Sequence, residues 1–236
     1  MRIRAFGILL AAMAAVILPT QTSIVDSQNT AERIVGGHDA TESYGFYTKL
    51  LVNGAFNCGG SLIAPEWVVT AQHCVLLQPT SVRIGGSTIS GGEEIKIAST
   101  DSVGPDFGII KLASPSKQGT PIPITDDALA VGAAVRILGH GTTCPTDGCG
   151  SAAKTLQELD TALAAGCGAG AQELCVGDTK GKGACRGDSG GPMIIKVNGR
   201  WELGGATSRG SSVCGNTPAI YEKVPAFRDW IKAHTG

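Results

Sequence analysis

Residues 47–63 read YTKLLVNGAFNCGGSLI and give the first indication of the fold. Asn53 and Gly54 stand between two runs rich in aromatic and aliphatic side chains. An Asn-Gly pair in this setting favours a two-residue hairpin turn, because both turn positions need a positive φ. The same pattern returns in residues 193–207, MIIKVNGRWELGGAT, around a second Asn-Gly pair. The sequence therefore predicts two β-hairpins far apart in the chain.

Further short, strand-like runs lie between and beside these hairpins. They are residues 67–70, 82–84, 107–112 and 131–138. Regular short strands separated by glycine-rich turns favour barrels or sandwiches over units that alternate strands with helices. Residues 114–125 contain three prolines and are the best candidate for a linker between two β-rich halves.

Two segments carry helical signals. Residues 152–163 have moderate helix propensity. Near the C-terminus, Phe227, Trp230 and Ile231 recur at the spacing of one helix face, after Pro225. We therefore expect a mostly β protein in two parts, with a terminal helix.

The composition excludes several classes of protein. The 236 residues are 42% hydrophobic, which is enough for a real core and argues against wholesale disorder. The formal net charge is −1 and no block of Lys or Arg occurs. Neither nucleic acid nor an anionic membrane surface is therefore an expected partner.

The first residues resemble an export signal. Arg2 and Arg4 precede an apolar run over residues 5–18, which Pro19 ends. This run is shorter than the roughly 20 residues that span a bilayer. It fits a secretory signal peptide, cleaved near residues 20–23, better than a membrane anchor, which is the alternative. We expect a secreted protein, free of the membrane after processing.

Eight cysteines in an exported chain indicate four disulfides, and eight cysteines allow 105 pairings. Sequence spacing makes Cys144/Cys149 and Cys167/Cys175 candidates for short-loop bridges. A zinc site is the competing interpretation. It is weak because no C-x-x-C motif occurs and the histidines are scattered.

Three short segments resemble the chymotrypsin/trypsin-like family of serine proteases. They are residues 70–74 (TAQHC), 106–112 (DFGIIKL) and 187–192 (GDSGGP). Gln72 stands where the family more often has alanine. The order His, Asp, Ser separates this family from subtilisins and α/β-hydrolases. The resemblance runs from Ile34 to the last helix and implies an all-β fold of two packed antiparallel six-stranded barrels with a C-terminal helix.

The resemblance assigns catalytic roles to three side chains. Ser189 would attack the peptide carbonyl, because a serine hydroxyl becomes a good nucleophile once a base takes its proton. His73 would be that base, and Asp106 would orient it. The N–H groups of Gly187 and Ser189 would stabilise the oxyanion. The remaining histidines, His38, His140 and His234, are interpreted as surface or structural residues.

An activation site follows from Arg33-Ile34-Val35-Gly36-Gly37. In the family, cleavage before this run frees an α-ammonium group that pairs with the aspartate preceding the nucleophile. Here the pair would be Ile34 and Asp188, after an activator has cut behind Arg33. We expect a signal peptide over residues 1–22, an activation propeptide over 23–33 and one protease domain over 34–236, with its barrel junction near 114–125.

The resemblance also selects disulfides. Cys58 and Cys74 would brace the catalytic histidine, and Cys185 and Cys214 the specificity pocket. Cys167 and Cys175 resemble a family bridge with a shortened loop. Cys144 and Cys149 are paired only as the remainder.

The specificity pocket can be located in the same way. Its base would be Gly183, followed by Ala184, and its walls Ser208-Arg209-Gly210 and residues 217–221, with Ala219 narrowing the interior. Without an aspartate at the base, cleavage after Lys or Arg is disfavoured. We expect a preference for Leu, Met, Phe or Tyr, and inefficient self-activation at Arg33.

Arg209 replaces the family's usual tryptophan, and Arg186 lies near the mouth of the cleft. Together they would favour acidic residues near the scissile bond by Coulomb attraction, unless both point into water. No metal or other cofactor is expected. The expected partners are protein or peptide substrates and protein inhibitors of proteases, and the chain is expected to be a monomer.

Two other functions remain as alternatives. A protease-like binding protein would keep the fold without catalysis, but such proteins usually lose a catalytic residue or the nucleophile motif. A secreted lipase or esterase would use a G-x-S-x-G turn, which residues 187–191 match by coincidence. The β-rich pattern and the order of the catalytic residues count against it. The sequence thus predicts a secreted serine endopeptidase made as a zymogen.

Overall fold

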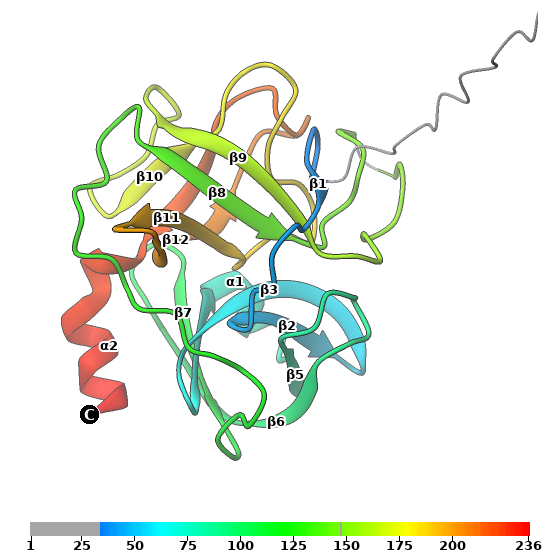
Figure 1. Cartoon of the computed structure of the whole chain (residues 1–236), viewed down its shortest axis with the longest axis vertical. Coiled ribbons are helices and arrows are strands. Elements are labelled where there is room, and N and C mark those ends of the chain that lie inside the picture. The colour runs from blue at the N-terminus through cyan, green and yellow to red at the C-terminus, as the bar shows by residue number, and fades with distance from the viewer. Residues whose placement is uncertain (1–33, 147) are drawn as a thin grey trace, which may run out of the picture. The chain divides into compact units, whose positions relative to one another are not determined.

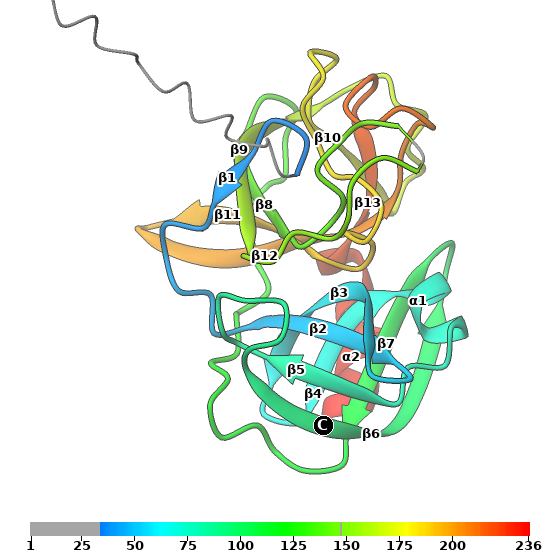
Figure 2. The ribbon, with the colours of Figure 1, turned by 90° about the vertical axis from the view of Figure 1, so that its right-hand side faces the viewer.

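Strands dominate this computed structural model, which describes residues 34–146 and 148–236 (Figure 1). The predicted signal peptide and propeptide, with Arg33, lie outside these residues. Hydrogen bonds between neighbouring strands close into two antiparallel six-stranded barrels, and a short helix ends the chain. In Figure 2 the first barrel occupies the lower part of the view and the second the upper part. The predicted fold is confirmed.

The first barrel is a closed ring in the order β2-β3-β4-β7-β6-β5. Its strands are β2 (Tyr47–Val52), β3 (Ala55–Ala64), β4 (Trp67–Ala71), β5 (Ser81–Ile84), β6 (Glu93–Val103) and β7 (Phe107–Leu112). The sequence did not predict β6, whose side chains are mostly exposed and follow no clean alternation.

The second barrel closes in the order β9-β10-β13-β12-β11-β8, because β8 also pairs with β9. Its strands are β8 (Ala134–Gly139), β9 (Gln157–Ala164), β10 (Glu173–Val176), β11 (Pro192–Val197), β12 (Arg200–Arg209) and β13 (Ala219–Lys223). The short strand β1 (His38–Asp39) adds to the edge of β9. The proline-rich residues 114–125 lie in the connection between β7 and β8.

Both predicted hairpins are confirmed. Asn53 and Gly54 have φ values of 50° and 81° between β2 and β3, and Asn198 and Gly199 have φ values of 48° and 81° between β11 and β12. Asn and Gly tolerate this left-handed region better than other residues, so the turn chemistry sets the register of both hairpins.

The predicted helix over residues 152–163 is wrong, because most of this segment forms strand β9. Its side chains have reasonable helix propensity, but intrinsic propensity is a weak preference that tertiary contacts override. As a strand, the segment pairs with β8, β10 and β1 and supplies the hydrogen bonds that close the second barrel.

The C-terminal helical prediction is confirmed. A 3-10 turn, η1 (Val224–Phe227), leads into helix α2 (Arg228–Thr235). The Phe227 ring stacks on Phe107 of β7 with centroids 4.3 Å apart, and Trp230 meets the same ring edge-on at 5.9 Å. Figure 1 shows α2 beside the first barrel. These contacts attach the end of the chain to that barrel.

Two clusters of buried side chains form the core. One fills the second barrel and includes Ile34, Ile137 and Tyr221. The other fills the first barrel and continues into side chains of the second, such as Ile194 and Leu203. Because this cluster draws on strands from both barrels, the barrels pack together in one compact unit.

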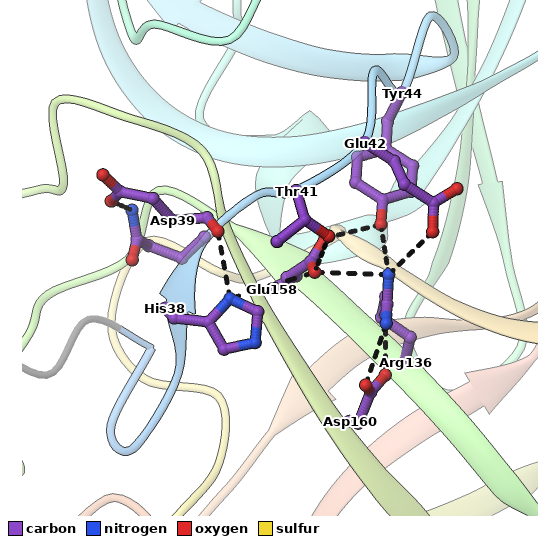
Figure 3. Close-up of polar contacts among 9 residues, drawn as sticks. His38, Asp39, Thr41, Glu42, Tyr44, Arg136, Glu158 and Asp160 are labelled. Atoms are coloured by element: carbon purple, nitrogen blue, oxygen red, sulfur yellow. Dashed lines mark hydrogen bonds and ion pairs between the residues drawn. The ribbon is translucent and has the colours of Figure 1, made fainter.

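A charge network around the buried Glu158 links the beginning of the described chain to the second barrel (Figure 3). The Arg136 guanidinium donates to Asp160 at 2.6 and 2.8 Å, to Glu42 at 3.1 Å and to the Tyr44 hydroxyl at 2.7 Å. Its Nη1 also lies 3.2 Å from Glu158, which is 1% exposed and accepts a hydrogen bond from Tyr44 at 2.6 Å. Glu158 is therefore a buried carboxylate with a cation and a hydroxyl donor.

All eight cysteines are paired, in the combinations that the resemblance implies. The disulfides are Cys58–Cys74, Cys144–Cys149, Cys167–Cys175 and Cys185–Cys214. One set of potential metal ligands, Cys58, His73 and Cys74, gathers within 4.8 Å. Its two sulfurs are joined to each other, so they are not available as thiolate ligands. None of the helices in the described residues has the length and apolar character of a membrane span.

Candidate active site

Strand pairing brings His73 and Asp106 together. In the register of β4 and β7, Ala71 lies opposite Phe107, so the residues just after β4 face those just before β7. The Gln72 N–H donates to the Asp106 carbonyl at 2.9 Å and joins these two ends. His73 is the second residue of the short helix α1 (Gln72–Leu76), which the sequence did not predict.

The Asp106 carboxylate accepts hydrogen bonds from two groups of His73, the backbone N–H and the imidazole ring. The backbone N–H of His73 donates to Oδ1 at 2.9 Å, and ring Nδ1 lies 2.9 Å from Oδ2 and 3.1 Å from Oδ1. An ionised carboxylate can only accept hydrogen bonds, so Nδ1 must carry the hydrogen. The lone pair of the neutral ring is then on Nε2, where a base needs it.

Asp106 is kept ionised by its hydrogen bonds. Burial would raise its pKa, but the bonds from His73 and from the Ser208 hydroxyl, which donates to Oδ2 at 2.6 Å, outweigh burial and hold the pKa below its ordinary value. Ser208 lies near the end of β12. The second barrel therefore supplies one of the hydrogen bonds to the acid of the first.

Ser189 sits in the loop before β11, and this loop is pinned between the barrels. Its carbonyl accepts the Gly59 N–H at 2.8 Å, and the Gly190 N–H donates to the Thr207 carbonyl at 2.7 Å. Gly190 has φ +74°, and a Cβ there would overlap Thr70 Oγ1 and lie 3.0 Å from the nitrogen of Ala71. Glycine is thus required, and it brings Ser189 close to the start of α1.

The backbone around Ser189 offers two hydrogen-bond donors. Gly187 adopts φ +92°, where glycine is favoured. Within residues 34–146 and 148–236, the N–H groups of Gly187 and Ser189 donate to no acceptor. Unpaired N–H groups of this kind can receive the negative oxygen of a tetrahedral intermediate. No hydrogen bond joins Ser189 to His73 among the described residues.

A cavity of about 200 Å³ opens beside Ser189. Six of the predicted pocket residues line it: Ala184, Arg186, Ser208, Arg209, Gly210 and Ala219. Thr207, Ser211 and Ser212 line it as well and were missed, although they flank the predicted wall in the sequence. The lining residues include no Asp or Glu.

Gly183 does not line this cavity. It is buried, and its N–H donates to the Val35 carbonyl at 2.9 Å in an isolated bridge. An added Cβ would meet only ordinary contacts, the nearest being the Cα of Gly215 at 3.6 Å. Ala184, the next residue, is the one that reaches the cavity.

The Arg209 side chain is 49% exposed, but its charge is paired. Its guanidinium binds the Glu173 carboxylate through two hydrogen bonds of 2.6 and 3.1 Å. Glu173, on β10, is only 4% exposed, and the hydrogen bond from Arg209 lowers its pKa. The positive charge of Arg209 at the cavity therefore has a carboxylate partner. Arg186 is exposed at the cavity.

Asp188 is buried at 1% exposure beside the nucleophile. Its carboxylate accepts the Gly141 N–H at 2.7 Å and the Cys185 N–H at 2.8 Å. Burial raises its pKa to about 7, and no ion pair reaches it within the described residues. Cβ atoms at Gly139 or Gly141 would overlap this carboxylate, so glycine makes the room for it.

Ile34 is fully buried in the cluster that fills the second barrel. An apolar side chain in this position anchors the start of the described chain near the loops that carry the nucleophile. The bridge between Val35 and Gly183 ties the next residue to the pocket segment.

Among the described residues, the other histidines make no hydrogen bond with His73, Asp106 or Ser189. His38 is exposed on β1, and His234 on α2 pairs with Asp101 at 2.9 Å. His140 is buried against Tyr47 and Phe56, and burial lowers its pKa to about 4. A buried, neutral imidazole bonded to the Ala153 carbonyl at 2.8 Å is a structural residue.

A comparison with protein families agrees with the geometry. The family model described as Trypsin matches residues 34–231. The match includes both barrels, His73, Asp106, Ser189 and the first half of the terminal helix. The chain belongs to the trypsin family, and its folded domain is that of a serine endopeptidase.

Proposed function

We propose that this protein is an active endopeptidase that hydrolyses peptide bonds through an acyl-enzyme on Ser189. The observation that carries the proposal is the doubly held His73, with Nδ1 2.9 Å from Asp106 Oδ2, near a serine flanked by two unpaired N–H groups. A binding protein would need neither an oriented base nor vacant oxyanion donors.

The chemical steps follow from this arrangement. Ser189 Oγ attacks the carbonyl carbon while His73 Nε2 takes its proton. The carbonyl oxygen becomes negative and accepts hydrogen bonds from the N–H groups of Gly187 and Ser189. The imidazolium, stabilised by Asp106, then gives its proton to the leaving amine as the C–N bond breaks. Water, activated by His73, hydrolyses the ester and restores Ser189.

Activation by cleavage after Arg33 is part of the proposal. Asp188 is a buried carboxylate that only two N–H groups hold among the described residues. A buried carboxylate gains from a cation of matching geometry. The α-ammonium of Ile34, whose side chain is already buried, would supply that charge and lock the loop from Cys185 to Ser189.

The proposed substrates are proteins and peptides with a medium apolar or aromatic residue before the scissile bond. The cavity lining includes no carboxylate to meet Lys or Arg, and it does include Arg186 and Arg209. Its volume of about 200 Å³ suits a single side chain of intermediate size. Leucine, methionine, phenylalanine and tyrosine should be cleaved ahead of lysine and arginine.

The proposed setting is extracellular. Four disulfides are stable in an oxidising compartment, and the apolar leader at residues 5–18 would direct export. Substrate proteins and protein inhibitors of serine proteases are the proposed partners of the mature domain.

Covalent labelling tests the proposal. The purified chain is cut after Arg33 with an arginine-specific protease and treated with a fluorescent organophosphonate, with Ser189→Ala as the matched control. Stoichiometric label on the peptide containing Ser189, absent from the variant, is expected. Cut wild-type protein that stays unlabelled while a control protease reacts would favour the alternative, a protease-like binding protein.

A further inference from the structure

Glu222, on β13, is a fully buried acid. Neither the sequence motifs nor the catalytic triad of Ser189, His73 and Asp106 gives it a role. Neither of its carboxylate oxygens has a hydrogen-bond partner among the described residues. Burying a carboxyl group in this way is costly once it ionises. Glu222 in its ionised form therefore lowers the stability of the folded protein.

Strand register places Glu222 beside a second acid. It lies directly opposite Glu173 on β10 and opposite Ala206 on β12. Directly opposed residues of antiparallel strands point to the same face of a sheet. Leu174 and Tyr221, the chain neighbours of these acids, point into the second barrel. The two acids therefore share the outer face, and both interact electrostatically with Asp106.

A chain of hydrogen bonds connects this face to the catalytic base. Glu173 binds Arg209 at 2.6 Å, and Arg209 Nη1 lies 3.3 Å from the Ser208 hydroxyl. Ser208 donates to Asp106 at 2.6 Å, and Asp106 holds His73. Arg209 and Ser208 thus link the carboxylate of Glu173 to that of Asp106.

Among the residues that the structure describes, Glu222 interacts electrostatically with Glu173, Asp106 and Arg209. Burial, followed by the negative charges of Glu173 and Asp106, raises the pKa of Glu222 to about 7, while Arg209 opposes the shift. Glu222 therefore gains or loses its proton in the range where a histidine base also titrates.

We propose that Glu222 is a positioning residue for the catalytic pair, whose proton sets the number of negative charges behind Asp106 and thereby the pH at which the enzyme becomes active. This inference rests on the proposed peptidase function and adds a pH control to it. When ionised, Glu222 stabilises the protonated imidazole, so more alkaline conditions are needed to free His73 as the base. When Glu222 is protonated it carries no charge, and Asp106 is then the carboxylate that acts on His73.

Coupling between the two groups gives a particular pH profile. At low pH Glu222 is neutral, like a glutamine, so its replacement changes nothing. At high pH protonation of the base no longer limits the rate, and the replacement again changes little. Only near neutral pH does the Glu222 charge act while protonation of the base still limits the rate. The effect of removing it should therefore peak there.

The test measures kcat/KM of the chain cut after Arg33 between pH 5 and pH 9, for wild type, Glu222→Gln and the control Glu202→Gln on β12. For Glu222→Gln we expect the midpoint of the acid limb to move down by about 0.5 to 1 pH unit, with a rate gain of about twofold near pH 7 and convergence at both ends. Glu222→Met, which also removes the charge, serves if the amide variant does not fold.

Different outcomes separate the possibilities. Profiles of Glu222→Gln and wild type that superimpose, or that differ by one constant factor at every pH, would overturn the role of Glu222 and leave the peptidase function standing. A wild-type protein inactive at every pH would overturn both. A downward shift confined to the Glu222 variants supports the inference.

Discussion

Asp106 accepts hydrogen bonds from three donors, the His73 backbone, the His73 ring and the Ser208 hydroxyl. The first two fix the position and tautomer of the base, while the third stabilises the carboxylate charge. Their contributions to catalysis should therefore differ in size. One substitution at Asp106 and one at Ser208 distinguish these contributions.

Asp106→Asn should lower kcat/KM by about four orders of magnitude, the loss usual for serine peptidases when the ring is held in the wrong tautomer. Ser208→Ala should lower it by only about tenfold, because one charge-assisted hydrogen bond is lost while the ring stays oriented. Steady-state hydrolysis of a leucyl or phenylalanyl peptide anilide measures both. Equal losses in the two variants would contradict this division of roles.

The two hairpins and strand β9 show which secondary-structure elements can be predicted from the sequence and which cannot. The Asn-Gly turns and the strands β4, β5 and β7 were predicted because their signals are local. Strand β9 was misjudged as helix, because its partners β8, β10 and β1 come from distant parts of the chain. The triad was predicted from motifs, whereas the pairing of Arg209 with Glu173 depends on the register of β10, β13 and β12, which no motif records.

Arg136, on β8, should be the most stabilising charged residue of the network in Figure 3. Arg136→Gln leaves Glu158, which is 1% exposed, without its cation, and we expect a loss of about 3 kcal/mol in the free energy of unfolding. Asp160→Asn is the matched control. That carboxylate is 65% exposed, so its loss should cost less than about 1 kcal/mol. Urea unfolding at pH 7 measures both, and similar losses would show that the burial of Glu158 is not what matters.

Before cleavage, the buried Asp188 makes the free energy of unfolding of the whole molecule depend on pH. Its pKa is about 7 in the folded chain, against an ordinary value of 3.8. A raised pKa means that its contribution to stability is complete below about pH 4 and is lost as the pH rises through about 7. An α-ammonium partner would remove this loss.

Cleavage after Arg33 should therefore raise the melting temperature more at pH 7.5 than at pH 5. Glu222 is present in both forms, so the difference between cut and uncut protein isolates Asp188. In Asp188→Asn the gain on cleavage should be small and the same at both pH values. Differential scanning calorimetry supplies the comparison, and an equal gain for wild type at pH 5 and pH 7.5 would mean that Ile34 does not pair with Asp188.

The central claim is that Ser189, His73 and Asp106 make this domain a working peptidase once Ile34 is freed. Its most direct test is the initial rate of peptide-anilide hydrolysis by the chain before cleavage, after cleavage at Arg33, and after cleavage of Ser189→Ala. The account predicts turnover only in the cut wild type, with leucyl and phenylalanyl substrates ahead of arginyl ones. Turnover that persists in cut Ser189→Ala, or none in cut wild type, would contradict it.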